Sequence, residues 1–149
     1  MTQKLWVPAA VALAVISLST SGAFAGRTMT PMKLKWSVSL NTAQEFPKET
    51  GAPAKAAGKF TGMVTGGKTL KWTLTFSHLT GPATAAHIHL GAKGKAGPVL
   101  IPLCGPCKSP ASGSIKVTGA EMTDLINGKT YVNVHTAKNP NGEIRGQVM

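Results

Sequence analysis

Hydrophobic and polar side chains alternate along much of the chain, and this pattern predicts its fold. In residues 33–41 every second side chain is large and apolar, namely Leu34, Trp36, Val38 and Leu40. The intervening positions are Lys or Ser. Because successive strand residues point to opposite faces of a sheet, this segment is predicted to be a half-buried strand. Residues 69–77 repeat the pattern, with Lys and Thr opposite the apolar positions.

Further strands are predicted between turn signals rich in Gly and Pro. They cover residues 59–65, 85–90, 98–103, 114–118, 131–135 and 144–148. One short helix is predicted near residues 119–127, because Thr118 and Glu121 form a capping box ahead of apolar residues at helical spacing. Many short strands with regular turns indicate an all-β fold, an antiparallel Greek-key sandwich or barrel.

The first 25 residues have the features of a secretory signal peptide. Lys4 precedes an apolar run over residues 5–18, and Ala23-Phe24-Ala25 provides a cleavage site. We expect cleavage after Ala25, with an uncleaved anchor as the alternative. The apolar run is short for a membrane span, so we expect no integral span in the mature protein. Residues 26–32 are predicted to be a flexible segment and residues 33–149 one domain, exported to the periplasm or outside the cell.

The chain is strongly basic, with 16 Lys and Arg, five Asp and Glu and a formal net charge of +11. Such a protein is expected to adhere to anionic material such as lipopolysaccharide or acidic polysaccharide. Nucleic acid is not an expected partner. The chain has a single Tyr and no basic strand interleaved with the aromatic residues that stack on bases.

Three of the four histidines are candidates for a metal site. His87 and His89 stand two residues apart on a predicted strand, so both imidazoles point to the same face. His135 lies on another predicted strand, on the face opposite its aliphatic residues. If the strands meet, these residues form a three-nitrogen site suited to copper or zinc. A cluster of hydrogen-bonded polar side chains is the alternative, and His78 is predicted to lie at the surface.

The segment from 128 to 148 combines this histidine with other polar groups. Two strands flank the turn Asn139-Pro140-Asn141-Gly142. One face of the resulting hairpin is aliphatic. The other face carries Tyr131, Asn133, His135, Glu143, Arg145 and Gln147. We expect Asn133, Glu143 and Arg145 to support and tune the metal ligands from behind.

Two cysteines form the sequence Cys104-Gly105-Pro106-Cys107. In an oxidising compartment such a pair usually closes a structural disulfide. Soft-metal binding and thiol exchange are the alternatives. Redox use requires the first cysteine to lie at the start of a helix, and no helix is predicted to start there. The sequence shows neither paired carboxylates nor a nucleophilic serine motif, so an enzymatic role is not favoured.

Several segments together resemble a known family. They are Leu40 to Pro47, Ala86 to Gly91, Gly97-Pro98-Val99, Tyr131 to Thr136, Asn139-Pro140 and Gly142 to Gln147. These segments resemble the CHRD domain, which is named for its repeats in the developmental antagonist chordin and also occurs alone in exported bacterial proteins. The resemblance covers residues 33 to 148. It implies a compact sandwich or barrel of immunoglobulin-like character and implies no settled chemistry.

A weaker resemblance is to Cu/Zn superoxide dismutase, a β-barrel whose copper site uses a His-x-His strand. The chain lacks the bridging histidine and the aspartate of that enzyme's zinc loop, so its activity is not carried across. Two hypotheses therefore stand. The first is an exported, non-enzymatic CHRD module that binds an unknown protein or an anionic envelope surface. The second is a copper- or zinc-binding protein, for metal handling or superoxide chemistry, that uses His87, His89 and His135.

Overall fold

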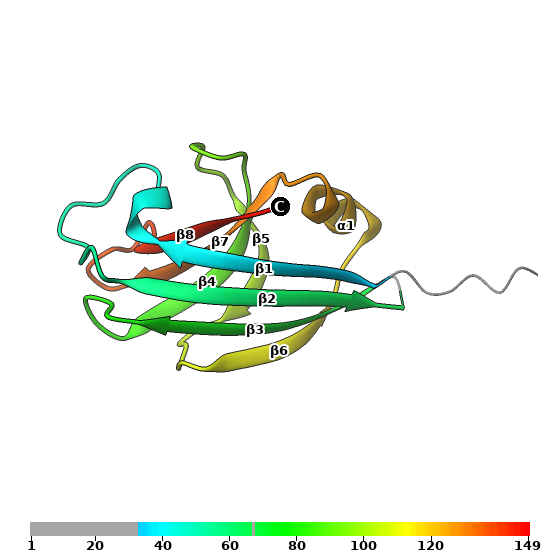
Figure 1. Cartoon of the computed structure of the whole chain (residues 1–149), viewed down its shortest axis with the longest axis horizontal. Helices are drawn as coiled ribbons and strands as arrows, with labels where there is room; N and C mark the ends of the chain where they lie inside the picture. The colour runs from blue at the N-terminus through cyan, green and yellow to red at the C-terminus, as the bar shows by residue number, and fades with distance from the viewer. Residues whose placement is uncertain (1–32, 67) are drawn as a thin grey trace, which may run out of the picture.

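In the part of the chain that the structure describes, eight strands form a single antiparallel sheet that curls into a nearly closed barrel (Figure 1). The computed structural model describes residues 33–66 and 68–149. The strands are β1 (Leu34–Asn41), β2 (Ala57–Thr65), β3 (Thr69–Ser77), β4 (Ala83–Leu90), β5 (Val99–Cys104), β6 (Ala111–Lys116), β7 (Thr130–Thr136) and β8 (Ile144–Val148). A 3₁₀ turn, η1 (Thr42–Gln44), follows β1, and the helix α1 (Gly119–Ile126) precedes β7. The predicted all-β fold with one short helix is confirmed.

The strand order is β5-β4-β7-β8-β1-β2-β3-β6, so the first and last strands of the chain are neighbours. In Figure 1, β1, β2, β3 and β6 form the nearer layer, and the other four strands cross behind it. The connections from β3 to β4 and from β6 to β7 join strands that are not neighbours, as in Greek-key arrangements. This order places β4 beside β7, although about 40 residues separate them in the chain.

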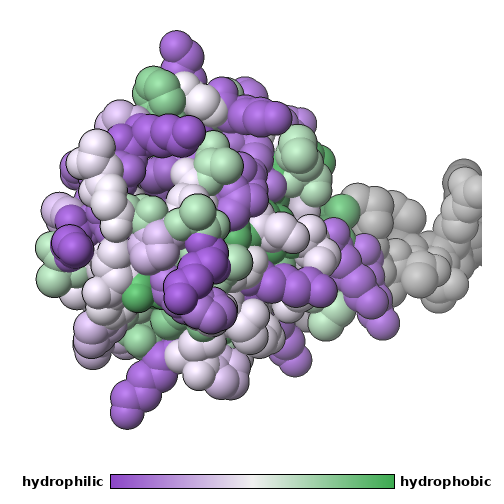
Figure 2. All heavy atoms as spheres, turned by 60° about the vertical axis from the view of Figure 1, so that its left-hand side comes forward, coloured by the Kyte–Doolittle hydropathy of each residue, from purple (hydrophilic) through white to green (hydrophobic). Residues whose placement is uncertain are grey.

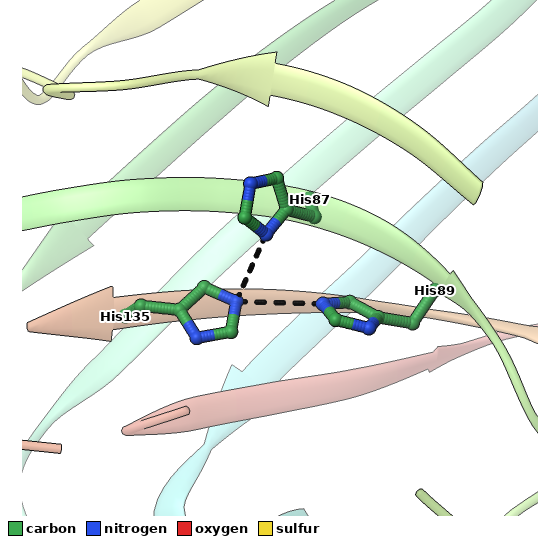
Figure 3. Close-up of side chains that lie close together, drawn as sticks. All are labelled: His87, His89 and His135. Atoms are coloured by element: carbon green, nitrogen blue, oxygen red, sulfur yellow. Dashed lines mark hydrogen bonds between the residues drawn. The ribbon is translucent and has the colours of Figure 1, made fainter. Parts of the chain in front are cut away.

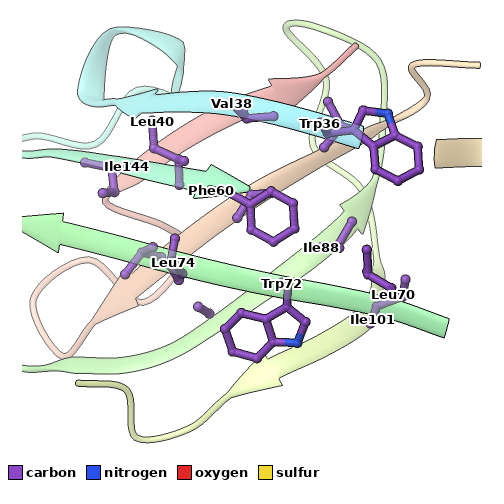
Figure 4. Packing of buried hydrophobic residues seen from close by; sticks show 14 of the residues in the cluster. Trp36, Val38, Leu40, Phe60, Leu70, Trp72, Leu74, Ile88, Ile101 and Ile144 are labelled. Atoms are coloured by element: carbon purple, nitrogen blue, oxygen red, sulfur yellow. The ribbon is translucent and has the colours of Figure 1, made fainter. Parts of the chain in front are cut away.

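The apolar side chains of both layers meet between them (Figure 4). The alternation predicted from the sequence is observed, with Trp36, Val38 and Leu40 buried and the intervening Lys and Ser exposed. Trp36 and Trp72 lie on either side of Gly62 in the sheet register. A side chain at Gly62 would lie 3.0 Å from the ring of Phe60. This small residue therefore leaves room for the large aromatic side chains of the core.

The polar face predicted for the β7–β8 hairpin is covered by loops and does not face solvent. Every residue of both strands is buried. Two loops cover the polar face. In the loop after β1, Glu45 accepts a 2.7 Å hydrogen bond from Asn133. Arg145 donates to the backbone oxygens of Lys95 and Ala92 in the β4–β5 loop. Period-two alternation separates the two faces of a strand, but it does not report whether a loop covers the second face.

Cys104 and Cys107 are paired at disulfide distance, with their Cα atoms 5.3 Å apart. The loop between them leads from the edge strand β5 towards the other edge strand, β6. Cys107 also donates its backbone N–H to the oxygen of Ala83 at the start of β4. The cysteine pair and this hydrogen bond therefore lie where the edge strands β5 and β6 approach each other, and the structural role expected from the sequence stays a prediction.

The signal peptide predicted for residues 1–25 and the flexible segment predicted for residues 26–32 lie outside the described residues. Within the described part of the chain, no helix has the length and hydrophobicity needed to cross a membrane.

The contact between β8 and β1 predicts one stability effect. A Cβ atom at Gly146 would lie 2.5 Å from Val38 Cγ1 and 2.6 Å from the backbone oxygen of Ser39. Because the backbone has little freedom to move, Gly146→Ala is expected to lower the free energy of unfolding by about 1–3 kcal/mol. Chemical denaturation measures this change. The control is Gly119→Ala, where no atom lies within 4 Å of the new Cβ; equal destabilisation of both variants would contradict the prediction.

Candidate metal centre

The pairing of β4 with β7 brings three imidazoles together. His87 is opposite Asn133 in the register, His89 is opposite Tyr131, and Ala85 is opposite His135. On β4 the neighbours Ala86 and Ile88 point into the core, so His87 and His89 point out of the barrel. Figure 3 shows the three rings at the corners of a triangle, with one nitrogen of His135 turned towards both of the other rings. The predicted convergence of these three histidines is thus present in the structure.

The distances between the ring nitrogens are short. His135 Nε2 lies 3.1 Å from His87 Nδ1 and 3.4 Å from His89 Nε2. One nitrogen of each ring lies within 4.8 Å of one nitrogen of each of the others. Two imidazoles on one ion, with metal–nitrogen bonds of about 2.0–2.1 Å and angles of about 90–120°, have their nitrogens about 2.9–3.6 Å apart. The two measured separations fall within that range.

Backbone carbonyls determine which ring nitrogens carry hydrogen. His89 Nδ1 lies 2.9 Å from the oxygen of Gly97, and His135 Nδ1 lies 3.0 Å from the oxygen of Pro140. A carbonyl oxygen can only accept a hydrogen bond, so both Nδ1 atoms must carry the hydrogen. In the neutral rings both Nε2 atoms therefore present bare lone pairs, and these two atoms face each other at 3.4 Å.

The surroundings also favour neutral imidazoles. Burial lowers the pKa of His135 to about 4, although its hydrogen bond to Pro140 acts in the opposite direction. Burial likewise lowers the pKa of His87 and of His89. The nearby charge of Arg145 lowers the pKa of His89 further. At neutral pH the lowered pKa values therefore favour the neutral form of the three rings, in which one nitrogen of each ring is free to bind a metal ion.

Tyr131 and Arg145 form a stack behind His89. The Tyr131 ring lies parallel to the His89 ring with the centroids 5.0 Å apart. The guanidinium carbon of Arg145 lies 3.4 Å from the centroid of the Tyr131 ring. The Tyr131 hydroxyl also accepts a hydrogen bond from the backbone N–H of Gly97. The oxygen of the same residue accepts the hydrogen bond of His89 Nδ1. The stack therefore fixes both the position of the His89 ring and the loop that sets its tautomer.

The structure places the three predicted supporting residues differently from one another. Arg145 lies behind His89, as described above. Asn133 donates a hydrogen bond to the Glu45 carboxyl. Burial raises the pKa of Glu45, although this hydrogen bond acts to lower it. Glu143 turns away from the imidazoles and accepts hydrogen bonds from Thr80, Thr136 and Asn139. It acts at a distance, by holding the loop that carries Pro140.

Sequence reasoning missed three groups of the centre. The Gly97 and Pro140 oxygens belong to the backbone of irregular loops, and no residue type signals them. Tyr131 was placed on the polar face, but its role as a platform for His89 depends on the register of β4 against β7. His78 lies apart from the centre, where its ring bonds to Ser77 Oγ, in agreement with the predicted surface position.

Comparison with known proteins supports the resemblance found in the sequence. The sequence model of the CHRD domain matches residues 36–148. The chain belongs to the CHRD family. Searches of curated proteins and of solved structures gave no match. The matched range of this CHRD domain contains all three imidazoles and both loops that orient them.

The Glu143 carboxylate is the anchor of the β7–β8 loop in this CHRD domain. It is fully buried. Burial acts to raise its pKa, but hydrogen bonds from Thr80, Thr136 and Asn139 outweigh this effect and hold the pKa below the ordinary value of 4.5. Because the folded state has the lower pKa, the stability contribution of Glu143 is fully present above about pH 4.5. It is lost as the pH falls through the folded-state pKa.

Glu143→Gln is expected to lower the free energy of unfolding by about 2–3 kcal/mol at neutral pH, because donors aimed at a carboxylate lose part of their acceptor. The difference from the unmodified protein should shrink as the pH falls below about 4.5. Denaturant unfolding at several pH values measures both effects. A difference that stays constant from pH 7 to about pH 3 would contradict this account. Glu49→Gln, which removes a carboxylate from the loop before β2, is the control.

Proposed function

We propose that this CHRD domain is a metal-binding module that holds one copper or zinc ion through His87, His89 and His135. The observation that carries the proposal is the pair of bare Nε2 lone pairs of His89 and His135, which face each other at 3.4 Å. Without a proton or a cation between them, two such lone pairs repel. His87 Nδ1 can donate a hydrogen bond to His135 Nε2, but this leaves the lone pair of His89 without a partner.

The donor chemistry favours these metals. Neutral imidazole nitrogen is a common ligand of both copper and zinc, and hard cations such as Ca²⁺ and Mg²⁺ prefer oxygen ligands. At an imidazole site Cu²⁺ generally binds more tightly than Zn²⁺. The second contacts of His89 and His135, to Gly97 and Pro140, are of the kind that orient metal-binding histidines. A hydrogen-bonded cluster without metal is the competing explanation.

Metal titration distinguishes the two explanations. With one equivalent of Cu²⁺, the chain is expected to give an electron paramagnetic resonance spectrum with nitrogen couplings. His89→Ala should weaken binding at least about 100-fold, because even the loss of indirect support for a ligand costs about 10–100-fold. The matched control is His78→Ala, which removes an imidazole outside the centre. Equal copper affinity of both variants and the unmodified chain would exclude the proposed site.

A second candidate function, binding of acidic polysaccharide, is favoured by the outer face of the nearer layer. The sheet register aligns three rows of outward side chains across its strands. They are Lys35, Met63, Lys71 and Ser114; Ser37, Thr61, Thr73 and Ser112; and Ser39, Lys59 and Thr75. We call these residues the lysine face. None of its four strands contains Asp or Glu.

The chemistry of the lysine face suits a polymer with carboxylates and hydroxyls. The three lysines attract the negative charges, and the Ser and Thr hydroxyls can both donate and accept hydrogen bonds. The face has no aromatic side chain on which nucleic-acid bases could stack. Figure 2 shows hydrophilic side chains spread over the face in view, with hydrophobic residues interspersed among them. An exported protein with this surface would adhere to anionic envelope material, in line with its net charge.

Charge reversal tests the lysine face. The double variant Lys35→Glu/Lys71→Glu is expected to bind polygalacturonate at least about tenfold more weakly at low salt, because attraction is replaced by repulsion. The matched control is Lys48→Glu/Lys55→Glu, which changes the net charge equally in the loop before β2. Sedimentation with the polymer measures binding. An equal loss in both double variants would show that only the net charge matters and would contradict a specific face.

A further inference from the structure

A cavity of about 790 Å³ opens directly onto the candidate metal centre. His87, His89 and His135 form part of its wall, and the other lining residues come from four segments of the chain. We propose that the metal ion keeps a coordination position open to this cavity and there binds a small organic carboxylate with an apolar body. This inference rests on the metal site proposed above and adds the class of ligand that the site accepts.

The number of protein donors leaves the fourth coordination position of the proposed metal ion open. The described part of the chain offers three imidazole nitrogens at this point, and no Cys, Asp or Glu joins them. Catalytic zinc sites have three protein donors and a fourth position for water or substrate, whereas structural zinc sites have four protein donors. The centre therefore has the donor count of an open site.

The charge balance favours an anion. Three neutral imidazoles leave the two positive charges of the ion uncompensated. Among the described residues no Asp or Glu lines the cavity, and the Arg145 guanidinium behind Tyr131 has its acidic partner, Glu45, outside the lining. In a partly enclosed site such charges interact strongly with an incoming anion, because little water screens them. A carboxylate is thus a better fourth ligand than a neutral donor.

The cavity rim favours an apolar body on that carboxylate. Phe46 and Val99 are 46% and 49% exposed, although most large hydrophobic residues of the described chain are buried. Both line this cavity, from the loop after β1 and from the start of β5 respectively. Pro47, Ala96 and Pro140 contribute further apolar surface. Apolar ligand atoms that contact Phe46 and Val99 would cover these exposed side chains and gain from leaving water.

Cobalt substitution makes this position visible, because the intensity and position of the Co²⁺ absorption bands change with its ligands. The full chain is loaded with one equivalent of Co²⁺ and titrated with sodium benzoate or sodium acetate. Both anions are expected to shift the bands, and benzoate should bind at least about tenfold more tightly than acetate. Phe46→Ser and Val99→Ser should each weaken benzoate binding about threefold or more and leave acetate affinity within about twofold.

The matched control is Ile126→Ser, which removes another exposed hydrophobic side chain, 51% exposed, from α1. It should change neither affinity. Co²⁺ that binds without any response to the anions would overturn the open position and leave the metal site standing. Equal affinities for benzoate and acetate would overturn the apolar part of the proposal. Failure of Co²⁺, Cu²⁺ and Zn²⁺ to bind at all would remove the metal site, and this inference with it.

Discussion

The structure depends on one constraint: polar groups that are buried must find hydrogen-bond partners within the chain. The β7–β8 hairpin has no solvent-facing side, and its polar face carries Arg145 and Gln147. Their donors reach the backbone oxygens of Ala92, Lys95 and Gly91, all in the β4–β5 loop. These bonds satisfy the buried groups and also hold the loop against the sheet. Glu143 does the same for the loop on the other side of the centre.

The imidazoles are oriented by these two loops. Gly97 lies at the end of the loop that Arg145 and Gln147 hold, and its oxygen accepts a hydrogen bond from His89 Nδ1. Pro140 lies in the loop that Glu143 holds, and its oxygen accepts a hydrogen bond from His135 Nδ1. Both rings therefore present Nε2 to the same point. A site assembled in this way by the folding of its surroundings would lose little conformational freedom on binding the proposed ion.

Much of the fold and part of the centre follow from the sequence, for reasons that particular residues make clear. The strict alternation around Trp36 and Trp72 fixes which faces are buried, and the His87–Ile88–His89 spacing places two imidazoles on one face. The meeting of His135 with them required β4 and β7 to be neighbours, which alternation alone does not determine. The backbone oxygens of Gly97 and Pro140 were beyond reach, because they depend on the course of irregular loops. Glu143 was expected near the imidazoles, but the nearby donors of Thr80 and Asn139 draw its side chain the other way.

The two candidate functions occupy opposite sides of the barrel and do not compete for surface. β4 lies in the rear layer, and β1 and β3 lie in the nearer layer (Figure 1). His87 and His89 point outward from β4, and Lys35 and Lys71 point outward from β1 and β3. The hydrophobic core separates the two faces. A polymer bound to the lysine face would therefore leave the cavity above the imidazoles open to solvent. If both proposals hold, the same arrangement would keep the open position of the metal centre accessible at an anionic surface, so the two functions would be compatible in one domain.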